Sequence, residues 1–345
     1  MYSLEEISLS PDAWDAAIRG YKSKALFHES AWLAHLERTQ NGQRLLVAIR
    51  DGNDDVGYFC GVVIRKGPFR VLGSPLRGWW TPVMGPIVNE CDEQALLVAL
   101  GNFCRTKGID YIELCSHVFK DESMEAAGYL PENDITYLLR ISSPDEMWRR
   151  MEKNARNPIR QAEKKGVSVE AASDISVMGE YFAQLQAVFA RKSLTPPHRR
   201  EMVYDLWESL YPLGKLVVLR AMHEGRYIAT HIGAFDERVL YGLGWASWPE
   251  AYPLRPNDLI QWKVMTFAAE KGLLLYDMCG GGEFKAKFGA EVVPRVRWHK
   301  GLTLSARIGR DLYKAFWFGR RELLQRLRRW HSETKLATEP VGHEG

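Results

Sequence analysis

FCRTKGIDYIELC at residues 103–115 and FAAEKGLLLYDMC at residues 267–279 are the two stretches on which the fold prediction depends. A Phe, a Lys-Gly pair and a final Cys recur in both at a constant offset of 164, from 103 to 267, 107 to 271 and 115 to 279. Each stretch has the pattern of an amphipathic helix end, a Lys-Gly stop and a buried strand. The two stretches are therefore expected to be copies of one structural unit.

The segments upstream of these stretches also match each other. Two strand-like runs around a turn occupy residues 45–65, and two more occupy residues 215–235. Each half thus reads strand, strand, helix, strand, which a tandem duplication of one α/β unit explains most simply. We expect an α/β (α+β) fold with two tandem domains, 1–142 and 143–304, each a mixed sheet flanked by helices.

The remaining elements are placed around this repeat. A closing strand of the first half is expected at 135–141, followed by a long polar helix from Ser143 to about Lys165 that Pro158 should kink or break. A basic amphipathic helix is expected at 305–330, and a disordered tail at 331–345. Further helices are expected at 11–19, 30–39, 174–192 and 198–210.

Composition narrows the class of protein. The 345 residues are 46% hydrophobic and 26% charged, which excludes whole-chain disorder and fibrous repeats. No apolar run is long enough to span a bilayer, and the acidic start does not resemble a secretory signal. The five cysteines include no CxxC pair, so we expect neither a disulfide framework nor a metal site. We predict a cytoplasmic protein, with the inner face of the membrane as an alternative location.

Positive charge is concentrated in two segments, although the net charge is only +3. Residues 285–330 carry thirteen Lys and Arg against three acids, and residues 149–165 carry seven against two. Such clusters favour a polyanionic partner, either RNA, a phosphorylated substrate or an anionic membrane surface. Solvated basic helices are the alternative explanation.

A candidate site follows the second Cys. Gly280, Gly281 and Gly282 permit a tight turn whose N–H groups could hold an oxyanion or phosphate, or the turn is merely flexible. Asp277 ends the preceding strand, where it either faces a cleft or pairs with a cation. Lys285 could meet a carboxylate, phosphate or developing oxyanion, or it could be an ordinary surface lysine. The neighbouring Phe284 and Phe288 are expected to share one helix face.

Aromatic residues could line a cleft near this site. Trp79 and Trp80 lie in a rigid loop of the first half, and Trp245 and Ser247 end a strand of the second. Such residues can stack a sugar, base or apolar chain, although core packing explains most tryptophans. The candidate substrate-binding residues in this region are Trp80, Tyr241, Trp245, Ser247 and Asn257.

Two other residues that could react are given structural interpretations. His231 lies in an apolar strand, so we expect a core histidine. Cys279 has no evident His partner, which disfavours nucleophilic cysteine chemistry. No Ser-His-Asp elbow, HExxH, Walker loop or GxGxxG is present.

A series of short motifs resembles a known family. It comprises RNPIRQAEKKGV at 156–167, Trp-Ala-Ser at 245–247, a helix-opening Pro256, Tyr-Asp at 276–277 and Phe-Lys-x-x-Phe-Gly at 284–289. In this order, over roughly residues 25–300, the series is similar to the Fem-like (FemABX) aminoacyltransferases and the BioF2-like acetyltransferase domains of the GNAT superfamily. The resemblance implies two tandem GNAT-like domains with a cleft between them.

The resemblance also implies a reaction and roles for residues. Family members transfer an acyl group to an amine, and the Fem branch uses aminoacyl-tRNA. Lys285 would then be the essential residue and Arg191 a phosphate- or carboxylate-binding residue. For the chemistry itself we expect Lys285 or the N–H groups of 280–282 to stabilise the oxyanion, with Asp277 as an orienter or proton acceptor. The loop from Asp277 to Phe284 is shorter than in typical Fem enzymes, and no Arg/Gln-x-x-Gly-x-Gly/Ala cradle for CoA is present.

Three functions therefore remain open at this point. The first is transfer of an aminoacyl group from aminoacyl-tRNA to a cell-wall precursor or small metabolite. The second is acyl-CoA-dependent N-acylation of a sugar or metabolite amine, and the third is a non-catalytic envelope-associated scaffold. In the first two, aminoacyl-tRNA or acyl-CoA is a co-substrate, and no tightly bound cofactor is expected. The two basic segments would contact tRNA in the first, and residues 305–330 could contact a membrane in the third.

Overall fold

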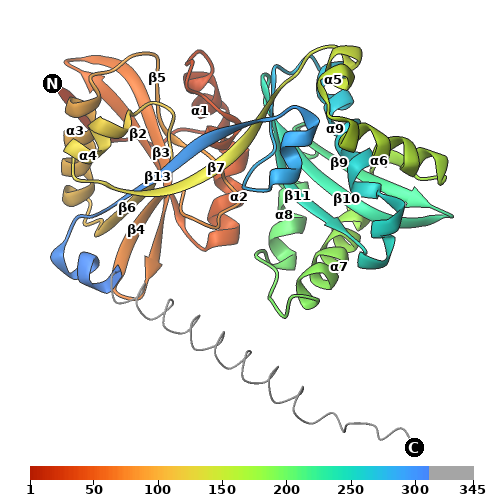
Figure 1. Ribbon diagram of the computed structural model, residues 1–345. Helices are drawn as coiled ribbons and strands as arrows, with labels where there is room; N and C mark the ends of the chain where they lie inside the picture. Colours follow the sequence, from red (N-terminus) through yellow and green to blue (C-terminus); the bar gives the residue numbers. More distant parts are fainter. Residues whose placement is uncertain (311–345) are drawn as a thin grey trace, which may run out of the picture.

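One mixed sheet runs through both halves of the molecule (Figure 1). The computed structural model describes residues 1–310. Within them the strands follow the order β1-β2-β3-β4-β6-β13-β7-β12-β11-β10-β9-β8, and β5 pairs with β3. Only β4 with β6 and β11 with β12 pair in parallel; the other described pairs are antiparallel.

The first half supplies twelve of the described elements. They are β1 (Tyr2–Glu6), α1 (Pro11–Ile18), η1 (Leu26–His28), α2 (Ser30–Gln40), β2 (Gln43–Asp51), β3 (Asp54–Lys66), β4 (Phe69–Ser74), β5 (Gly85–Val88), α3 (Glu93–Thr106), β6 (Tyr111–Leu114), α4 (Asp121–Ala126) and β7 (Leu130–Arg140).

The second half begins with two helices and ends on a long strand. Its elements are α5 (Pro144–Arg150), α6 (Lys153–Lys164), β8 (Ser168–Ala171), α7 (Ser176–Ala190), α8 (Arg200–Leu210), β9 (Leu216–His223), β10 (Arg226–Phe235), β11 (Val239–Ser247), η2 (Pro249–Leu254), α9 (Pro256–Glu270), β12 (Leu275–Asp277), η3 (Glu283–Phe288) and β13 (Glu291–Gly301).

The predicted duplication is confirmed. In the first half α3 leads to β6, and in the second half α9 leads to β12. Gly108 and Gly272 follow the two helices with φ of 63° and 70°, left-handed values that glycine adopts without steric cost. In both copies the strand after the helix pairs in parallel with an earlier strand of the same half, β6 with β4 and β12 with β11.

The closing strand of the first half differs from the prediction. The segment expected at 135–141 belongs to β7, which pairs with β12 of the second half and with β13. In turn β13, the last described strand, pairs with β6 of the first half. The halves thus exchange strands, and Figure 1 shows β7 and β13 crossing from one half to the other. Local strand patterns do not encode which sheet a strand joins, so the sequence could not reveal this exchange.

The polar helix breaks at a different residue from the one predicted. It is divided between α5 and α6 at Met151, whose backbone is extended, whereas Pro158 lies inside α6. Met151 is buried in the core of the second half, and the N–H of Glu152 donates to the Lys287 carbonyl oxygen. Tertiary contacts therefore fix the break, and the helix accommodates the proline.

The helices of the two halves pack against each other. One hydrophobic cluster includes Phe27 and Trp32 from the first half together with Tyr181 and Leu206 from the second. Beside it α2 packs on α8, where the Asp205 carboxylate binds Arg38 and His35. Each half also has a cluster on the other face of the sheet, to which the exchanged strands contribute: Trp298 of β13 to the first and Tyr137 and Leu139 of β7 to the second. The shared cluster joins the halves through side chains as well as through the sheet.

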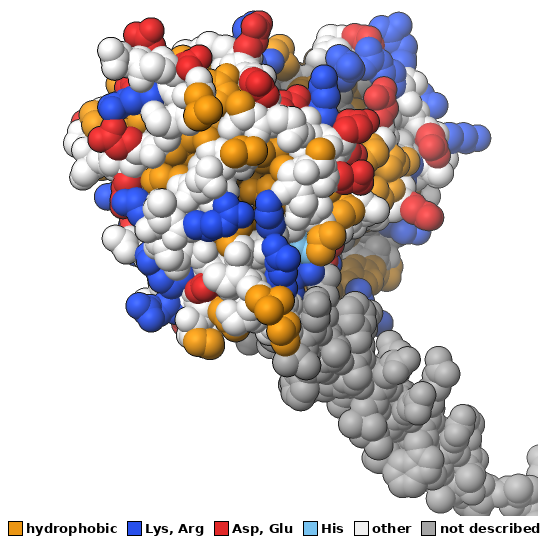
Figure 2. All heavy atoms as spheres, turned by 90° about the vertical axis from the view of Figure 1, so that its left-hand side faces the viewer, with side chains coloured by type: hydrophobic (Ala, Val, Ile, Leu, Met, Phe, Trp, Pro, Cys, Tyr) orange, Lys and Arg blue, Asp and Glu red, His pale blue; other side chains and the backbone are white. Residues whose placement is uncertain are grey.

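The C-terminal predictions fall mostly outside the described residues. Residues 304–310 are helical, whereas the rest of the helix predicted at 305–330 and the tail predicted at 331–345 are not among those described. Figure 2 shows the face that carries α3 and α4, where acidic and basic side chains are interspersed. Within residues 1–310, none of the helices combines the length and the apolar character needed to cross a membrane.

Candidate functional site

The parallel pair of the second half separates after three residues. Val239, Leu240 and Tyr241 of β11 pair with residues 275–277 of β12. Beyond Tyr241, β11 continues to Ser247 with no strand paired to it on the β12 side in the described structure. We call residues 242–247 the open edge of β11. Backbone N–H and C=O groups along such an edge can pair with an extended ligand.

A β-bulge lies at the start of the open edge. Ile232 of β10 pairs with Gly244 and Gly233 pairs with Gly242, so Leu243 is the extra residue on β11. A bulge leaves its extra residue unpaired and re-aims the neighbouring groups, and bulges are common next to active sites. The bulge and the strand separation thus coincide within two residues of chain.

Two glycines flank the bulge because aromatic side chains leave no room for larger residues. A Cβ on Gly244 would lie 2.6 Å from the Tyr181 hydroxyl oxygen, and one on Gly242 would lie 2.9 Å from the Tyr276 hydroxyl oxygen. Tyr181 comes from α7 and Tyr276 from β12. Side chains from both neighbouring elements therefore press directly on the backbone at the bulge.

Trp80 brings the first half to this site. Its backbone has the left-handed φ of 62°, and its indole Nε1–H donates a hydrogen bond to the Leu243 carbonyl oxygen. The indole ring stacks on the His198 ring at a centroid distance of 4.0 Å. Burial lowers the pKa of His198 to about 4, so this ring is neutral at pH 7. Trp80 is therefore a wall of the site and binds the bulge residue itself, and its role in binding substrate stays a prediction.

Asp277 is fully engaged by neighbouring donors. Its side chain is 2% exposed; Oδ1 accepts hydrogen bonds from the Thr136 hydroxyl and from the Cys279 N–H, 2.9 Å away. Oδ2 forms an ion pair with Arg295 of β13, which is also buried. Of the two readings of Asp277, the structure supports pairing with a cation. With these partners Asp277 can orient the loop after β12.

Lys285 is buried among backbone carbonyls. Its Nζ donates to the carbonyl oxygens of Met278 at 2.9 Å, Gly280 at 2.9 Å and Cys279. Burial lowers the pKa of Lys285, partly offset by the nearby Asp277. In this arrangement the ammonium group holds the loop after β12 in place. The role of Lys285 toward an oxyanion stays a prediction.

The expected helix face around Lys285 is wrong in detail. Residues 283–288 form the 3₁₀-helix η3, in which Phe288 is 1% exposed and Phe284 is 55% exposed. Because a 3₁₀-helix has three residues per turn, positions i and i+3 share a face. Lys285 and Phe288 are therefore buried together, whereas Phe284 is on the surface, with its ring centroid 6.0 Å from Lys285 Nζ.

The glycine loop has the backbone that its sequence predicts. Gly280 and Gly282 have φ of 68° and 142°, and Gly280 and Gly281 are exposed. Cys279, just before them, also has a positive φ of 46°. Burial, reinforced by Asp277, raises the pKa of the Cys279 thiol well above its usual value. The thiol is therefore protonated at neutral pH and is a poor nucleophile.

The other predicted residues separate into two places. Tyr241 is buried opposite Asp277 in the strand register. Ser247 accepts a hydrogen bond of 3.0 Å from the Asn257 side-chain amide, and Trp245 packs on His231 at 4.1 Å. These residues all lie along β11 or at the start of α9. Arg191 instead ends α7 on the surface, 5.9 Å from the Tyr252 ring centroid.

His231 has the properties of a core residue. It is completely buried, and its Nε2 lies 3.3 Å from the Tyr276 hydroxyl. Burial lowers its pKa to about 3, so the ring is neutral. This agrees with the interpretation made from its apolar neighbours.

Sequence reasoning missed the partners of these residues. Thr136, Arg295, Tyr181 and His198 were not singled out, although all four touch the site. One signal was available for Arg295: Arg295 and Arg297 alternate along a strand and so share a face. No cluster of three metal-binding side chains occurs among residues 1–310.

Comparisons with known proteins agree with this architecture. Residues 149–287 match the family model described as Acetyltransferase (GNAT) domain. FemX is similar over 86% of this chain and 96% of its own, with a TM-score of 0.68 and 15% identity. A tandem GNAT protein from the clavulanic acid biosynthesis pathway is similar over 88% and 99%, with a TM-score of 0.55 and 10% identity.

A third solved structure also has a similar fold. L-PGS from Bacillus licheniformis is similar over 86% of this chain and 96% of its own, with a TM-score of 0.53 and 12% identity. A search of curated protein sequences gave no match. The chain has the fold of FemX and of a tandem GNAT protein, and its residues 149–287 match an acetyltransferase (GNAT) domain.

Proposed function

We propose that this GNAT-fold acyltransferase is of the Fem type and transfers an aminoacyl group from aminoacyl-tRNA to the amine of a cell-wall precursor or small metabolite. The observation that carries the proposal is the open edge of β11, with its bulge at Leu243. Backbone groups that have no strand partner beside a strand separation suit an extended acyl donor whose carbonyl needs fixed N–H donors. One such donor is typically worth about 3–4 kcal/mol of transition-state stabilisation.

The surface of α6 supports tRNA as the carrier of the acyl group. Lys153, Arg156, Arg160 and Lys164 are spaced so that they form one stripe along the helix, opposite the buried Ala155, Ile159 and Ala162. Over residues 1–310 none of the four has an acidic partner within ion-pair distance. Figure 1 shows α6 on the outer side of the second half. An unpaired basic stripe of this kind favours phosphate contacts.

The second basic segment behaves differently over its described part. Lys287 pairs with Asp258, Arg295 with Asp277, and Arg297 lies 3.6 Å from Glu113. Lys285 and Lys300 donate to backbone carbonyls. Most of the charge at residues 285–300 is therefore used within the fold, and the proposed tRNA contact rests on 149–165 and on residues beyond 310.

The start of α9 disfavours acyl-CoA. Binding a pyrophosphate at a helix N-terminus needs free N–H groups and the absence of competing acids. Here Pro249, Pro253 and Pro256 lack N–H groups, the 3₁₀-helix η2 fills the preceding loop, and Asp258 lies in the first turn of α9. These features oppose a pyrophosphate at this position.

The chemistry is aminolysis of an ester. The neutral nitrogen of the acceptor attacks the aminoacyl carbonyl, the C–N bond forms, and the ester C–O bond breaks. The proton lost by nitrogen passes to the departing ribose oxygen, directly or through solvent. Positioning of the two substrates supplies much of the rate in such reactions. Asp277 and Lys285 would contribute by fixing the loop 279–282 beside the reacting carbonyl.

The test measures binding of aminoacylated total tRNA by filter retention at increasing salt, with acyl-CoA in parallel. We expect tRNA binding that weakens steeply with salt. In the double variant Lys153→Gln/Lys164→Gln the slope of log K against log salt should become shallower by about 1.4 to 1.8.

The matched control is Arg65→Gln/Lys66→Gln, two exposed basic residues at the end of β3. It should leave the slope unchanged. Absence of tRNA binding, or equal effects of both double variants, would reject the tRNA proposal. Transfer of radiolabelled amino acid from tRNA into acid-soluble product is the second readout, with a bacterial metabolite extract as the acceptor source.

Acyl-CoA-dependent N-acylation is the second candidate. The match of residues 149–287 to an acetyltransferase domain and the exposed Gly280 and Gly281 favour it. A stoichiometric CoA complex in native mass spectrometry, lost in Gly280→Pro, would select this candidate.

A further inference from the structure

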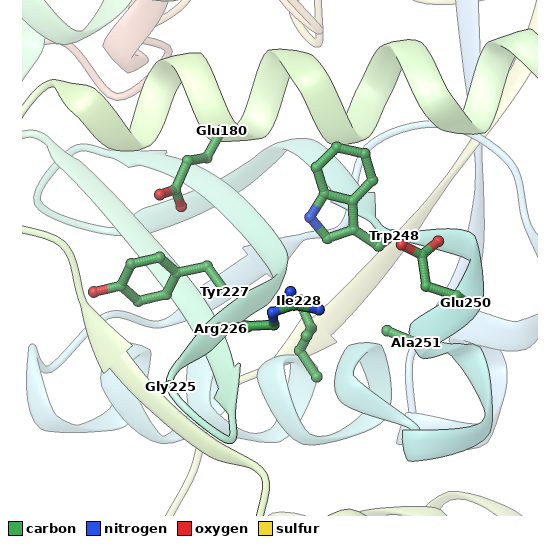
Figure 3. Close-up of a pocket in the computed structure, with 8 residues that line it drawn as sticks. All are labelled: Glu180, Gly225, Arg226, Tyr227, Ile228, Trp248, Glu250 and Ala251. Carbon is green, nitrogen blue, oxygen red and sulfur yellow. The ribbon is translucent and has the colours of Figure 1, made fainter.

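A pocket of about 540 Å³ lies after the C-terminal end of β11, at the opposite end of this strand from the residues that pair with β12. It is lined by Glu180 from α7, by the turn and start of β10 at 225–228, and by Trp248, Glu250 and Ala251 after β11. Figure 3 shows Glu180 extending from α7 on one side and Glu250 rising from η2 on the other, with Trp248 between them. The volume is that of an ordinary small-molecule site.

One oxygen in this pocket lacks a partner. The Glu180 Oε2 atom is buried and has no hydrogen-bond partner among the described residues. Leaving a buried carboxylate oxygen unpaired costs free energy, and burial accordingly raises the pKa of Glu180, against the opposing effect of Arg220. A donor brought by a ligand would remove this cost.

The neighbouring side chains are held in place by each other. The Tyr227 hydroxyl donates to Glu170, and Arg220 lies 3.8 Å from the Tyr227 ring centroid and pairs with Glu170. These partners leave Arg220 engaged with Tyr227 and Glu170 instead of with Glu180. On the other side of the pocket, the backbone N–H of Trp248 donates to the Ile228 carbonyl oxygen at 3.0 Å and fixes that wall. The pocket is therefore preformed.

The charge and shape of the lining indicate a class of ligand. Two carboxylates, Glu180 and Glu250, face one exposed guanidinium, that of Arg226, and an indole ring supplies an apolar wall. A carboxylate beside an indole is a favourable setting for an ammonium group, because the indole face also attracts cations. We propose that this pocket binds a primary amine attached to an apolar or ring-shaped body, with Glu180 holding the ammonium group.

The pocket's position suits the acceptor substrate, an assignment that rests on the proposed function. Tyr181, the residue next to Glu180 on α7, presses on Gly244 beside the bulge. Trp248 directly follows Ser247, the last residue of the open edge. The ammonium group held by Glu180 would therefore anchor the acceptor along the same strand that is proposed to hold the acyl donor, on the face covered by α7, and a separate, neutral nitrogen of the acceptor would attack the carbonyl.

The test uses the full chain and two matched probes, cyclohexylmethylamine and cyclohexylmethanol. At pH 7 the first carries an ammonium group where the second carries a hydroxyl, and the rest of the two molecules is identical. Binding is followed by NMR through the indole N–H signal of Trp248, which is assigned with Trp248→Phe. We expect the amine to bind at least about tenfold more tightly than the alcohol. Glu180→Gln should abolish that preference, and Glu201→Gln, an exposed acid on α8, should retain it.

Two outcomes would overturn the proposal: equal binding of amine and alcohol, or an unchanged preference in Glu180→Gln with native thermal stability. If Glu180→Gln does not fold, Glu180→Asp serves instead and should weaken amine binding alone. The salt-dependent tRNA assay does not involve this pocket. If the wild-type protein binds tRNA normally but does not prefer the amine over the alcohol, the pocket proposal is rejected. If it prefers the amine but neither binds tRNA nor transfers the amino acid, the proposed function is rejected.

Discussion

The two parallel strand pairs come from the same repeat, yet one is closed and the other is open. In the first half β4 pairs with β6 as far as Ser74 and Leu114. After these residues, the Cys115 N–H donates to the Ser74 carbonyl oxygen, and the Met84 N–H donates to the Cys115 carbonyl oxygen. The chain itself thus fills the space between the strands. In the second half β11 and β12 stop pairing at Tyr241 and Asp277. A duplicated unit can therefore lose its site in one copy by pairing its strands with its own loop.

The loop that closes the first copy also completes the second. Residues 75–84 connect β4 to β5, and Trp80 from this loop donates to the Leu243 carbonyl at the bulge. A loop of the first copy thus forms one side of the site in the second copy.

The largest expected difference concerns equivalent carboxylates. Asp277 and Glu113 are related by the offset of 164, and each meets an arginine of β13, Arg295 or Arg297. Asp277→Ala leaves Arg295 buried without its partner, so the free energy of unfolding should fall by about 3–5 kcal/mol. Glu113→Ala should cost about 1 kcal/mol, because Arg297 keeps its bond to the Pro75 carbonyl. Urea denaturation measures both, and equal losses would contradict the proposed difference.

Loss of the lysine that holds the loop after β12 is expected to have the next largest effect. Lys285→Met keeps an apolar chain of similar length but removes the donor to three backbone carbonyls. The free energy of unfolding should fall by about 2–3 kcal/mol. Amide exchange at Gly280–Gly282 should accelerate, as measured by hydrogen exchange.

Lys287→Met is the matched control for this variant. Lys287 lies two residues away and pairs with the partly buried Asp258. Its loss should cost about 1 kcal/mol and leave exchange in the glycine loop unchanged. Faster exchange in both variants would show that Lys285 has no special role in the loop.

Trp80→Phe tests the contribution of the closed copy to the open one. Phenylalanine retains a ring beside His198 but cannot donate to the Leu243 carbonyl. We expect a loss of about 1–2 kcal/mol in stability and a lower rate of acyl transfer. Trp79→Phe is the comparison, because Trp79 is buried in the first half. Calorimetry and the transfer assay measure the two effects; a transfer rate reduced equally by both would argue against a direct role for Trp80.

The repeat could be predicted from the sequence because its signals are local. A Lys-Gly helix stop, a buried strand and their spacing are all written in the two stretches 103–115 and 267–279. The exchange of β7 and β13 is a matter of pairing between distant strands, and no local pattern specifies it. The break at Met151 likewise depends on a contact with Lys287 that lies far away in sequence.

The site was predictable in its residue types and less so in its contacts. Asp277, Lys285 and the three glycines lie together as their closeness in sequence requires. The hydrogen-bond partners of these residues could not be predicted from the sequence, because Thr136 and Arg295 reach Asp277 from the distant strands β7 and β13. Arg191 matched a motif, yet it lies on the surface at the end of α7.

The smallest expected effect tests whether the open and closed copies unfold together. Asp205 of α8 lies 2.7 Å from His35 Nδ1 and 2.6 Å from Arg38 Nε on α2, so it joins the two halves. Although burial acts to raise the pKa of Asp205, these two partners lower it to about 2. A carboxyl whose pKa is lowered on folding stabilises the protein above its unfolded pKa of about 3.9 and loses that contribution as the pH falls toward 2.

Solvent screening limits this contribution to about 1 kcal/mol. Asp205→Asn should therefore lower the free energy of unfolding by that amount at pH 7 and flatten its decline between pH 4 and 2. Urea denaturation followed separately in each half, through a fluorophore attached to Cys91 and one attached at Lys192→Cys, measures the coupling. Because β7 and β13 are shared between the halves, the two probes should report one transition in both proteins. Separate transitions in the wild type would mean that the closed copy does not support the open one.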